Sequence, residues 1–262
     1  MDREVRVAIL QAPGTNCDRE TAFAFEYVGA KVDFVSIFSF IEGEYTLSSY
    51  HILCLPGGFT YGDDISAGRV LANQLRFLLE EEIRNFYNEG KPILGICNGF
   101  QVLVKSGILP YGPFSEESVS LVFNRCGHFI DRWLYLKVES AKSLWLKEMP
   151  GVVFLPIAHA EGRFVVKKED ISWDLQKNSQ VVLQYCSPLG EVREEYNPNG
   201  SEKNIAGITD SSGRILGLMP HPERHFFKKQ NPFWSSQRED GILGDGYRIF
   251  RNGVEYVKST LL

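Results

Sequence analysis

Short apolar runs alternate with amphipathic stretches from the start of the chain to about residue 107. Four of these runs predict buried strands, at Val5–Gln11, Val32–Ile37, His51–Leu55 and Ile93–Ile96. Strands that alternate with helices form parallel sheets with right-handed crossovers. The pattern therefore predicts an α/β fold with a mostly parallel, doubly wound (flavodoxin-like) sheet, whose ligands bind at the carboxyl ends of the strands.

Amphipathic stretches between these strands predict the helices. Asp18 is placed to cap a helix over residues 19–29, and a further helix resumes at Gln101. A long helix is expected within residues 65–89, with an apolar inner face and a charged, solvated outer face. The inner face contains Leu71, Leu75, Leu78, Leu79 and Ile83, and the outer face contains Glu80, Glu81, Glu82 and Arg84.

After Pro110 the spacing changes to short strands without long helices between them. Antiparallel hairpins on the same sheet are the expected result, with a terminal helix over 241–258. The predicted strands are Ser120–Asn124, Phe129–Val138, Val152–Leu155, Arg163–Val166, Val181–Tyr185, Ile205–Thr209 and Arg214–Met219. The absence of a low-complexity linker and of a repeat favours one domain over residues 1–262.

Composition narrows the function classes. A formal net charge of −5 gives no support to a nucleic-acid or anionic-membrane partner. Five cysteines without paired spacing indicate a reducing compartment. The first residues lack an apolar signal core, and no uncharged apolar run approaches the length of a membrane span. We therefore expect a cytoplasmic protein.

Cys97 is the strongest candidate for a nucleophile. It follows the Ile93–Ile96 strand and lies between Gly95 and Gly99, before a helical stretch. Small residues on both sides of a nucleophile are typical of a sharp strand-to-helix turn, because side chains there would clash. The start of a helix also favours the thiolate. The alternative is a buried core cysteine, so the prediction depends on partners elsewhere in the chain.

His221 and Glu223 are the best candidates for those partners. Pro220 and Pro222 hold the backbone extended, and residues two apart in an extended segment point to the same side. Glu223 is therefore expected to reach one ring nitrogen of His221 and to leave the other for Cys97. His159 is a rival base, and a proline-rich surface turn is the alternative explanation of this segment.

Two backbone N–H groups, of Gly58 and Asn98, are the natural donors of an oxyanion hole. Gly57 and Gly58 follow a predicted strand, where glycine lets the main chain approach a substrate closely. One donor of this kind contributes about 3 kcal/mol to stabilising the transition state. The alternative for this glycine pair is a simple tight turn.

Five motifs together resemble a known family. They are Pro13–Asp18, Leu55–Asp63, Gly95–Gln101, Pro156–Phe164 and Gly217–Arg224. The chain resembles the class I (triad) glutamine amidotransferases, which share the cysteine elbow and the His-Pro-Glu segment. The other three motifs resemble those of the glutaminase subunits of phosphoribosylformylglycinamidine synthases.

This resemblance implies roles for individual residues. Cys97 would be the nucleophile, His221 and Glu223 its partners, and Gln101 would lie near the bound glutamine. Two positions depart from the family's usual pattern: Ala160 replaces a glycine, and His128 stands where arginine or lysine is common. Neither residue belongs to the triad, so these departures put in doubt only the local backbone shape or the contact with a partner.

The resemblance also implies a divided reaction. Glutamine would be hydrolysed through a glutamyl thioester, and ammonia would pass through a dry channel to a synthetase subunit, with which a small accessory subunit can assemble. That partner would use ATP and Mg²⁺ to convert formylglycinamide ribonucleotide to the amidine in de novo purine synthesis. No metal or cofactor is expected in this chain, which lacks the glycine-rich P-loop motif.

Three alternatives stay open at this point. The chain could be the triad glutaminase subunit of another amidotransferase pathway, which the neighbouring synthetase would reveal. It could be a cysteine peptidase or hydrolase on the same type of sheet, which an assay of ammonia release against peptide cleavage would separate. It could also be a binding or regulatory module with a decayed site, although the intact triad argues against this.

Overall fold

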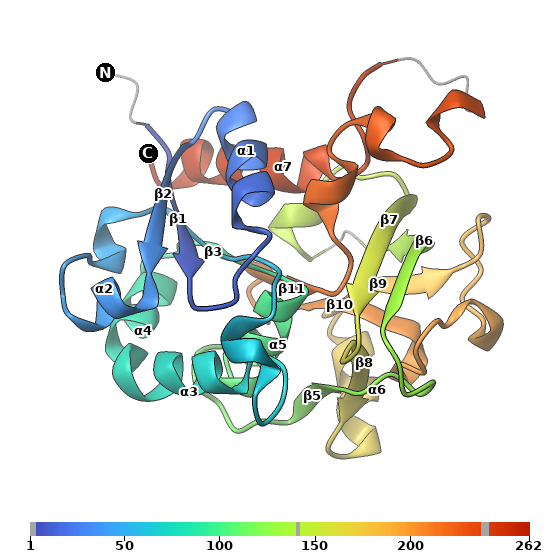
Figure 1. Ribbon diagram of the computed structural model, residues 1–262, viewed down its shortest axis with the longest axis horizontal. Helices are drawn as coiled ribbons and strands as arrows, with labels where there is room; N and C mark the ends of the chain where they lie inside the picture. The colour runs from blue at the N-terminus through green and yellow to red at the C-terminus, as the bar shows by residue number, and fades with distance from the viewer. Residues whose placement is uncertain (1–3, 140–141, 237–240) are drawn as a thin grey trace.

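A nine-stranded sheet runs through the computed structural model, which describes residues 4–139, 142–236 and 241–262 (Figure 1). Its strand order is β2-β1-β3-β4-β11-β10-β9-β6-β7. The strands are β1 Arg6–Gln11, β2 Lys31–Ser36, β3 Ile52–Leu55, β4 Ile93–Ile96, β6 Ile130–Val138, β7 Val152–His159, β9 Val181–Cys186, β10 Ile205–Thr209 and β11 Ile215–Leu218. Strands β5 (Val119–Val122) and β8 (Arg163–Val166) form a second, antiparallel sheet.

The large sheet divides into a parallel and an antiparallel half. Strands β2, β1, β3, β4 and β11 are parallel. Strands β10, β9, β6 and β7 add to β11 in antiparallel register. The predicted α/β class is therefore confirmed. The prediction that every later strand joins this sheet is wrong for β5 and β8, which form a separate two-stranded sheet.

Helices cover both faces of the sheet. In Figure 1, α1 and α7 lie on one side of it and α3, α4 and α5 on the other, as in a doubly wound fold. The helices are α1 Asp18–Tyr27, α2 Ile37–Ile41, α3 Arg69–Leu78, α4 Glu80–Asn88, α5 Asn98–Lys105, α6 Glu169–Lys177 and α7 Tyr247–Thr260. The single domain predicted over residues 1–262 stays a prediction.

The long helix predicted within residues 65–89 is two helices. The backbone leaves the helical region at Leu79, between α3 and α4. Three glutamates then occupy the first turn of α4, where the positive end of the helix dipole favours them. The break turns Leu78 outward, where it is 56% exposed, so its assignment to the inner face is wrong. Glu82 is also more than solvated charge, because it accepts a hydrogen bond from the Leu47 backbone.

Other helix ends differ from the prediction. Cys17 rather than Asp18 occupies the N-cap position of α1. The terminal helix begins at Tyr247, later than the predicted residue 241. Helices α2 and α6 were not predicted. The acidic first turn of α6 and the spacing of Ile171 and Leu175 are the signals that indicate it.

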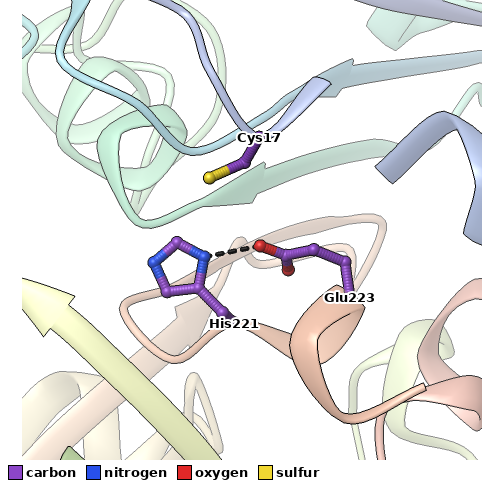
Figure 2. A group of neighbouring side chains, drawn as sticks. All are labelled: Cys17, His221 and Glu223. Atoms are coloured by element: carbon purple, nitrogen blue, oxygen red, sulfur yellow. Dashed lines mark hydrogen bonds and ion pairs between the residues drawn. The ribbon is translucent and has the colours of Figure 1, made fainter. Parts of the chain in front are cut away.

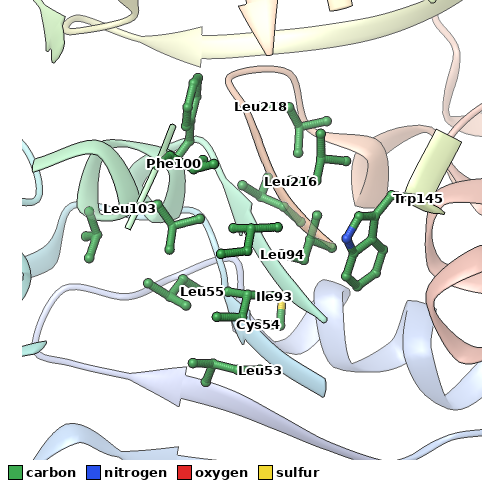
Figure 3. Packing of buried hydrophobic residues seen from close by; sticks show 14 of the residues in the cluster. Leu53, Cys54, Leu55, Ile93, Leu94, Phe100, Leu103, Trp145, Leu216 and Leu218 are labelled. Atoms are coloured by element: carbon green, nitrogen blue, oxygen red, sulfur yellow. The ribbon is translucent and has the colours of Figure 1, made fainter. Parts of the chain in front are cut away.

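The core lies between the sheet and its helices. The central strands β3, β4 and β11 are buried throughout, and their side chains pack together in Figure 3. Because these three strands are parallel, their carboxyl ends meet at one edge of the sheet. The loops that begin at Pro56, Cys97 and Met219 therefore lie side by side, which places the candidate site.

Within the described ranges, no helix has the length and apolar character that crossing a membrane requires. All five cysteines are free thiols. The cytoplasmic location stays a prediction.

Candidate active site

Cys97 sits at a strained turn between β4 and α5. Its φ of 51° and ψ of −104° are rare for a residue with a side chain, and such strain gathers at functional sites. Its backbone N–H donates to the Leu218 carbonyl at 2.7 Å, which ties the turn to β11. The side chain is 5% exposed, and its Sγ lies 3.7 Å from the Ala158 carbonyl oxygen.

The glycines around Cys97 are required by close packing. A Cβ on Gly99 would lie 1.9 Å from the Leu55 carbonyl oxygen, and a Cβ on Gly95 would lie 2.4 Å from the Leu103 Cδ1 atom. The first contact is with backbone, so helix α5 can start this close to β3 only with glycine at position 99, and a side chain at position 95 would force the Leu103 side chain to shift. The elbow predicted from the Gly-x-Cys-x-Gly spacing is therefore present.

His221 and Glu223 form a buried pair beside this turn. The His221 Nδ1 atom and the Glu223 Oε1 atom are 2.5 Å apart, and both side chains are at most 2% exposed (Figure 2). The His221 backbone N–H donates to the Pro156 carbonyl at 2.8 Å, which fixes the segment against β7. The predicted contact exists, but the predicted reason is wrong. Only His221 is extended, and Glu223 reaches it from a 3₁₀ turn over Pro222–His225.

Two opposing effects set the charge of His221. Burial disfavours the imidazolium, but the Glu223 carboxylate and the negative charge of the Cys97 sulfur outweigh it. The pKa of His221 is therefore held well above its ordinary value. Its Nε2 atom is buried and lacks a hydrogen-bond partner within the described residues. This is the arrangement of a base that is oriented through one nitrogen and available through the other.

The candidate oxyanion donors lie on either side of the elbow. Asn98 opens α5, so its N–H is among those that a helix leaves without an intrahelical acceptor. Gly58 has a φ of 154°, and a Cβ there would lie 2.8 Å from the Gly14 carbonyl oxygen. The loop is held by the Phe59 N–H, which donates to Gly14 at 2.9 Å. The role of both donors stays a prediction.

Gln101 makes contacts within the chain. Its Nε2 atom donates to the Glu161 carbonyl at 2.6 Å, and its Oε1 atom accepts from the Asn98 side chain at 2.8 Å. It is only 3% exposed. Gln101 thus braces the elbow helix against the loop after β7, and its predicted place near bound glutamine stays a prediction.

A buried ion pair next to this brace was not predicted from the sequence. The Lys105 Nζ atom donates to the Ala67 carbonyl at 2.6 Å and lies 3.5 Å from the Glu161 carboxylate. Burial lowers the pKa of Lys105 despite this partner. Asp63 is close enough to feel the same carboxylate, and burial followed by repulsion from Glu161 raises its pKa to about 6.

The rival base His159 occupies a different environment. It ends β7, is buried, and its Nδ1 atom lies 3.1 Å from the Asn124 amide oxygen, so its partner is an amide and not a carboxylate. Burial, reinforced by the positive charge of His221, lowers the pKa of His159 to about 3. The same Asn124 oxygen accepts from the Gly162 N–H at 3.2 Å, so His159 belongs to the contacts that hold the loop after β7. His159 is therefore a weaker candidate than His221.

The two unusual positions lie next to His159. The Ala160 carbonyl accepts from the Asn124 N–H at 2.8 Å. His128 is exposed, with its Nδ1 atom 3.0 Å from the Phe129 carbonyl oxygen. Neither of these contacts involves His221 or Glu223.

Cys17 is a second thiol at the site that sequence reasoning did not assign. It is 1% exposed and lies beside His221 and Glu223 (Figure 2). The Arg224 Nη2 atom donates to its Sγ at 3.2 Å. Cys54, by contrast, lies fully inside the core, where burial raises the pKa of its thiol well above the ordinary value.

Comparison with known proteins agrees with this geometry. Residues 4–257 match the CobB/CobQ-like glutamine amidotransferase domain family. The chain is similar to proteins named phosphoribosylformylglycinamidine synthase subunit PurQ. That of Dehalococcoides mccartyi is 42% identical, covering 98% of this chain and 99% of the relative. That of Archaeoglobus fulgidus is 40% identical, with the same coverage of both chains.

Solved structures give the same result. A chain in the structure of PurLQS from Thermotoga maritima is 31% identical with a TM-score of 0.75, and the match covers 97% of this chain and 100% of that one. A Thermoplasma acidophilum protein, described as a putative subunit of a GMP synthase, matches at a TM-score of 0.62 over 99% of this chain and 96% of that one. Its sequence is only 14% identical, so this match shows a shared fold alone. The chain therefore belongs to the glutamine amidotransferases, and within them to the family of PurQ subunits of phosphoribosylformylglycinamidine synthase.

Proposed function

We propose that this chain hydrolyses glutamine at Cys97, with His221 and Glu223 as the other members of a catalytic triad. It is the glutaminase subunit of phosphoribosylformylglycinamidine synthase, in de novo purine synthesis. The triad is our assignment. One observation carries it: β4 and β11 pair in register at Ile96 and Leu218, so the loops that follow bring Cys97 and His221 to the same sheet edge.

The first step is the attack of Cys97 on the side-chain amide of glutamine. The raised pKa of His221 favours a positive imidazolium beside the elbow, and a cysteine attacks as its thiolate. The Glu223 carboxylate stabilises the positive imidazole and fixes its orientation through Nδ1. Negative charge then develops on the amide oxygen, and the N–H groups of Gly58 and Asn98 are the donors that would stabilise it.

The second step releases ammonia and then glutamate. His221 protonates the departing nitrogen, which leaves a glutamyl thioester on Cys97. The neutral imidazole next removes a proton from water, which attacks the thioester and restores the thiolate. The same nitrogen, Nε2, serves both transfers, because Nδ1 is held by Glu223.

Ammonia is useful only where it stays unprotonated, so it must reach its acceptor without passing through bulk water. The partner is the synthetase subunit PurL, with the small subunit PurS, as in the assembly named PurLQS. We infer that PurL binds ATP and Mg²⁺, because this chain lacks a P-loop motif.

The test reconstitutes the reaction. The chain is mixed with its PurL and PurS, ATP, Mg²⁺ and formylglycinamide ribonucleotide, and glutamine labelled with ¹⁵N in its side-chain amide is the nitrogen source. We expect label in the amidine product, and none when this chain is left out. If ammonium supports synthesis but glutamine plus this chain does not, the proposal is wrong. A GMP synthase synthetase in place of PurL is the matched control, and activation of that enzyme would indicate another pathway.

A further inference from the structure

Cys17 forms a compact group with His221 and Glu223. One possible ligand atom from each residue, the Cys17 Sγ, a His221 ring nitrogen and a Glu223 carboxylate oxygen, all lie within 4.8 Å of one another. All three side chains are buried (Figure 2). Cys97 falls outside this group. The mechanism described above uses two of its members and leaves the Cys17 thiol without a task.

The thiol is held firmly in this position. The Cys17 N–H donates to the Gly57 carbonyl at 3.1 Å, and its own carbonyl accepts from the Thr21 hydroxyl at 2.6 Å. The segment that carries His221 and Glu223 is fixed by the His221 N–H, which donates to the Pro156 carbonyl. The group therefore comes from two segments far apart in the sequence, each anchored by its backbone. A ligand set that is already assembled loses little entropy when a cation binds.

Thiolate, imidazole and carboxylate are a donor set that suits Zn²⁺. With Zn–S near 2.3 Å and Zn–N near 2.0 Å, a tetrahedral site holds sulfur and nitrogen about 3.5 Å apart. The largest separation allowed by the observed group is 4.8 Å, so the Cys17 Sγ atom and the His221 nitrogen must close by at most about 1.3 Å. The His221 Nδ1 and Glu223 Oε1 atoms, 2.5 Å apart, share a hydrogen bond that a metal ion would have to replace. Within the described residues, the Glu223 Oε2 atom is buried without a hydrogen-bond partner, so one oxygen is free to bind.

A positive charge already occupies the edge of this group. The Arg224 Nη2 atom lies 3.2 Å from the Cys17 Sγ, and its Nε atom lies 4.0 Å from the Glu223 Oε1 atom. Its side chain is 39% exposed, so the guanidinium can withdraw into solvent. The site therefore favours a cation, and Arg224 is the group that a metal ion would displace.

We propose that Cys17, His221 and Glu223 form an inhibitory site for a thiolate-binding divalent cation, with Zn²⁺ the best fit. Binding would release protons from the thiol and the imidazole to solvent. It would also take from the triad the imidazole and carboxylate that hydrolysis needs. The inhibition rests on the proposed function, whereas the binding itself does not.

Direct binding is tested on the full-length chain carrying Cys97→Ala, so that the proposed nucleophile cannot contribute. Co²⁺ is the probe, because a thiolate ligand gives it a charge-transfer absorption band, and Zn²⁺ is then added to displace it. We expect one Co²⁺ per chain with this band. Adding Cys17→Ala should abolish the band and weaken Zn²⁺ binding at least about 100-fold, since loss of even an outer-shell partner costs 10- to 100-fold.

Two further variants keep the result decisive. Cys126→Ala, at an exposed cysteine, is the matched control and should leave the band unchanged. Cys17→Ser keeps the size of the side chain and should lose the band with its circular dichroism spectrum intact. A band that survives without Cys17, or that disappears with Cys126, overturns the proposal, as does an absence of binding by the Cys97→Ala chain.

The inhibition is tested in the complete complex. Zn²⁺ should reduce glutamine-dependent synthesis, a chelator that binds Zn²⁺ and leaves Mg²⁺ in solution should restore it, and ammonia-dependent synthesis should persist at the same Zn²⁺ concentration. Equal loss of both activities would place the inhibition on the synthetase and contradict an inhibitory role for this site. If the Co²⁺ band depends on Cys17 while the triad variants remain active, the proposed function fails and the metal site stands.

Discussion

Gly57→Ala perturbs the proposed base without substituting a triad residue. A Cβ at this position would lie 2.8 Å from the His221 Cε1 atom, whereas ordinary contact begins at 3.4 Å. The imidazole must therefore move by about 0.6 Å, which is most of the 1 Å misplacement that can cost about 100-fold in rate. We expect kcat for glutamine-dependent synthesis to fall by about 10- to 100-fold, equivalent to about 1.4 to 2.7 kcal/mol in the activation barrier.

The assay compares two nitrogen sources in the reconstituted complex. Ammonia-dependent synthesis should be unchanged in Gly57→Ala, because it bypasses this subunit. Gly151→Ala is the matched control, since in the described part of the structure a Cβ there would meet no atom within 4 Å. A Gly57→Ala chain with normal glutamine-dependent kcat would refute the placement of His221 in catalysis. Equal urea midpoints for both variants would exclude misfolding as the cause of any loss.

Three further predictions concern the same site. His221→Ala removes the proton carrier, whereas Glu223→Gln removes only its orienting charge, so kcat should fall further in the first variant; the reverse order would contradict these roles. We expect the isolated chain to release ammonia from saturating glutamine about 100-fold more slowly than the complex does. The reason is that PurL would turn the Gly58 N–H toward the substrate and so complete the oxyanion hole. Equal rates would refute this activation by PurL. Lys105→Met leaves the Glu161 carboxylate buried without its cation. The free energy of unfolding, measured by urea titration, should therefore fall by about 3–5 kcal/mol. A loss below about 1 kcal/mol would show that the ion pair contributes little to stability.

Much of the fold follows from local patterns. The central strands are short apolar runs, and their bounds agree with the sequence to within a residue or two at β3, β4 and β10. Helix interruption was harder to predict, because Leu79 continues the apolar spacing of α3 and only the backbone reveals the break. The separation of β5 and β8 from the main sheet depends on long-range pairing, which strand propensity does not encode.

The candidate site likewise contains local features that the sequence predicts and long-range contacts that it does not. The elbow at Cys97 is a local motif, so the sequence suffices to predict it, although the atoms that exclude a side chain at Gly99 belong to Leu55 of β3. The Lys105–Glu161 pair joins residues 56 positions apart, and the Cys17–Arg224 contact joins residues 207 positions apart. Nothing near either residue signals such a partner, because both contacts exist only once the strand ends converge.

The glutamine-dependent and ammonia-dependent rates of the complex carrying Cys97→Ala test the central claim most directly. Ammonia enters at the synthetase, so only hydrolysis of glutamine requires the Cys97 sulfur. We predict that synthesis from glutamine falls below detection while synthesis from ammonia stays at the level of the unmodified complex. Continued synthesis from glutamine would contradict the account and place the nucleophile elsewhere, with Cys17 the first residue to test.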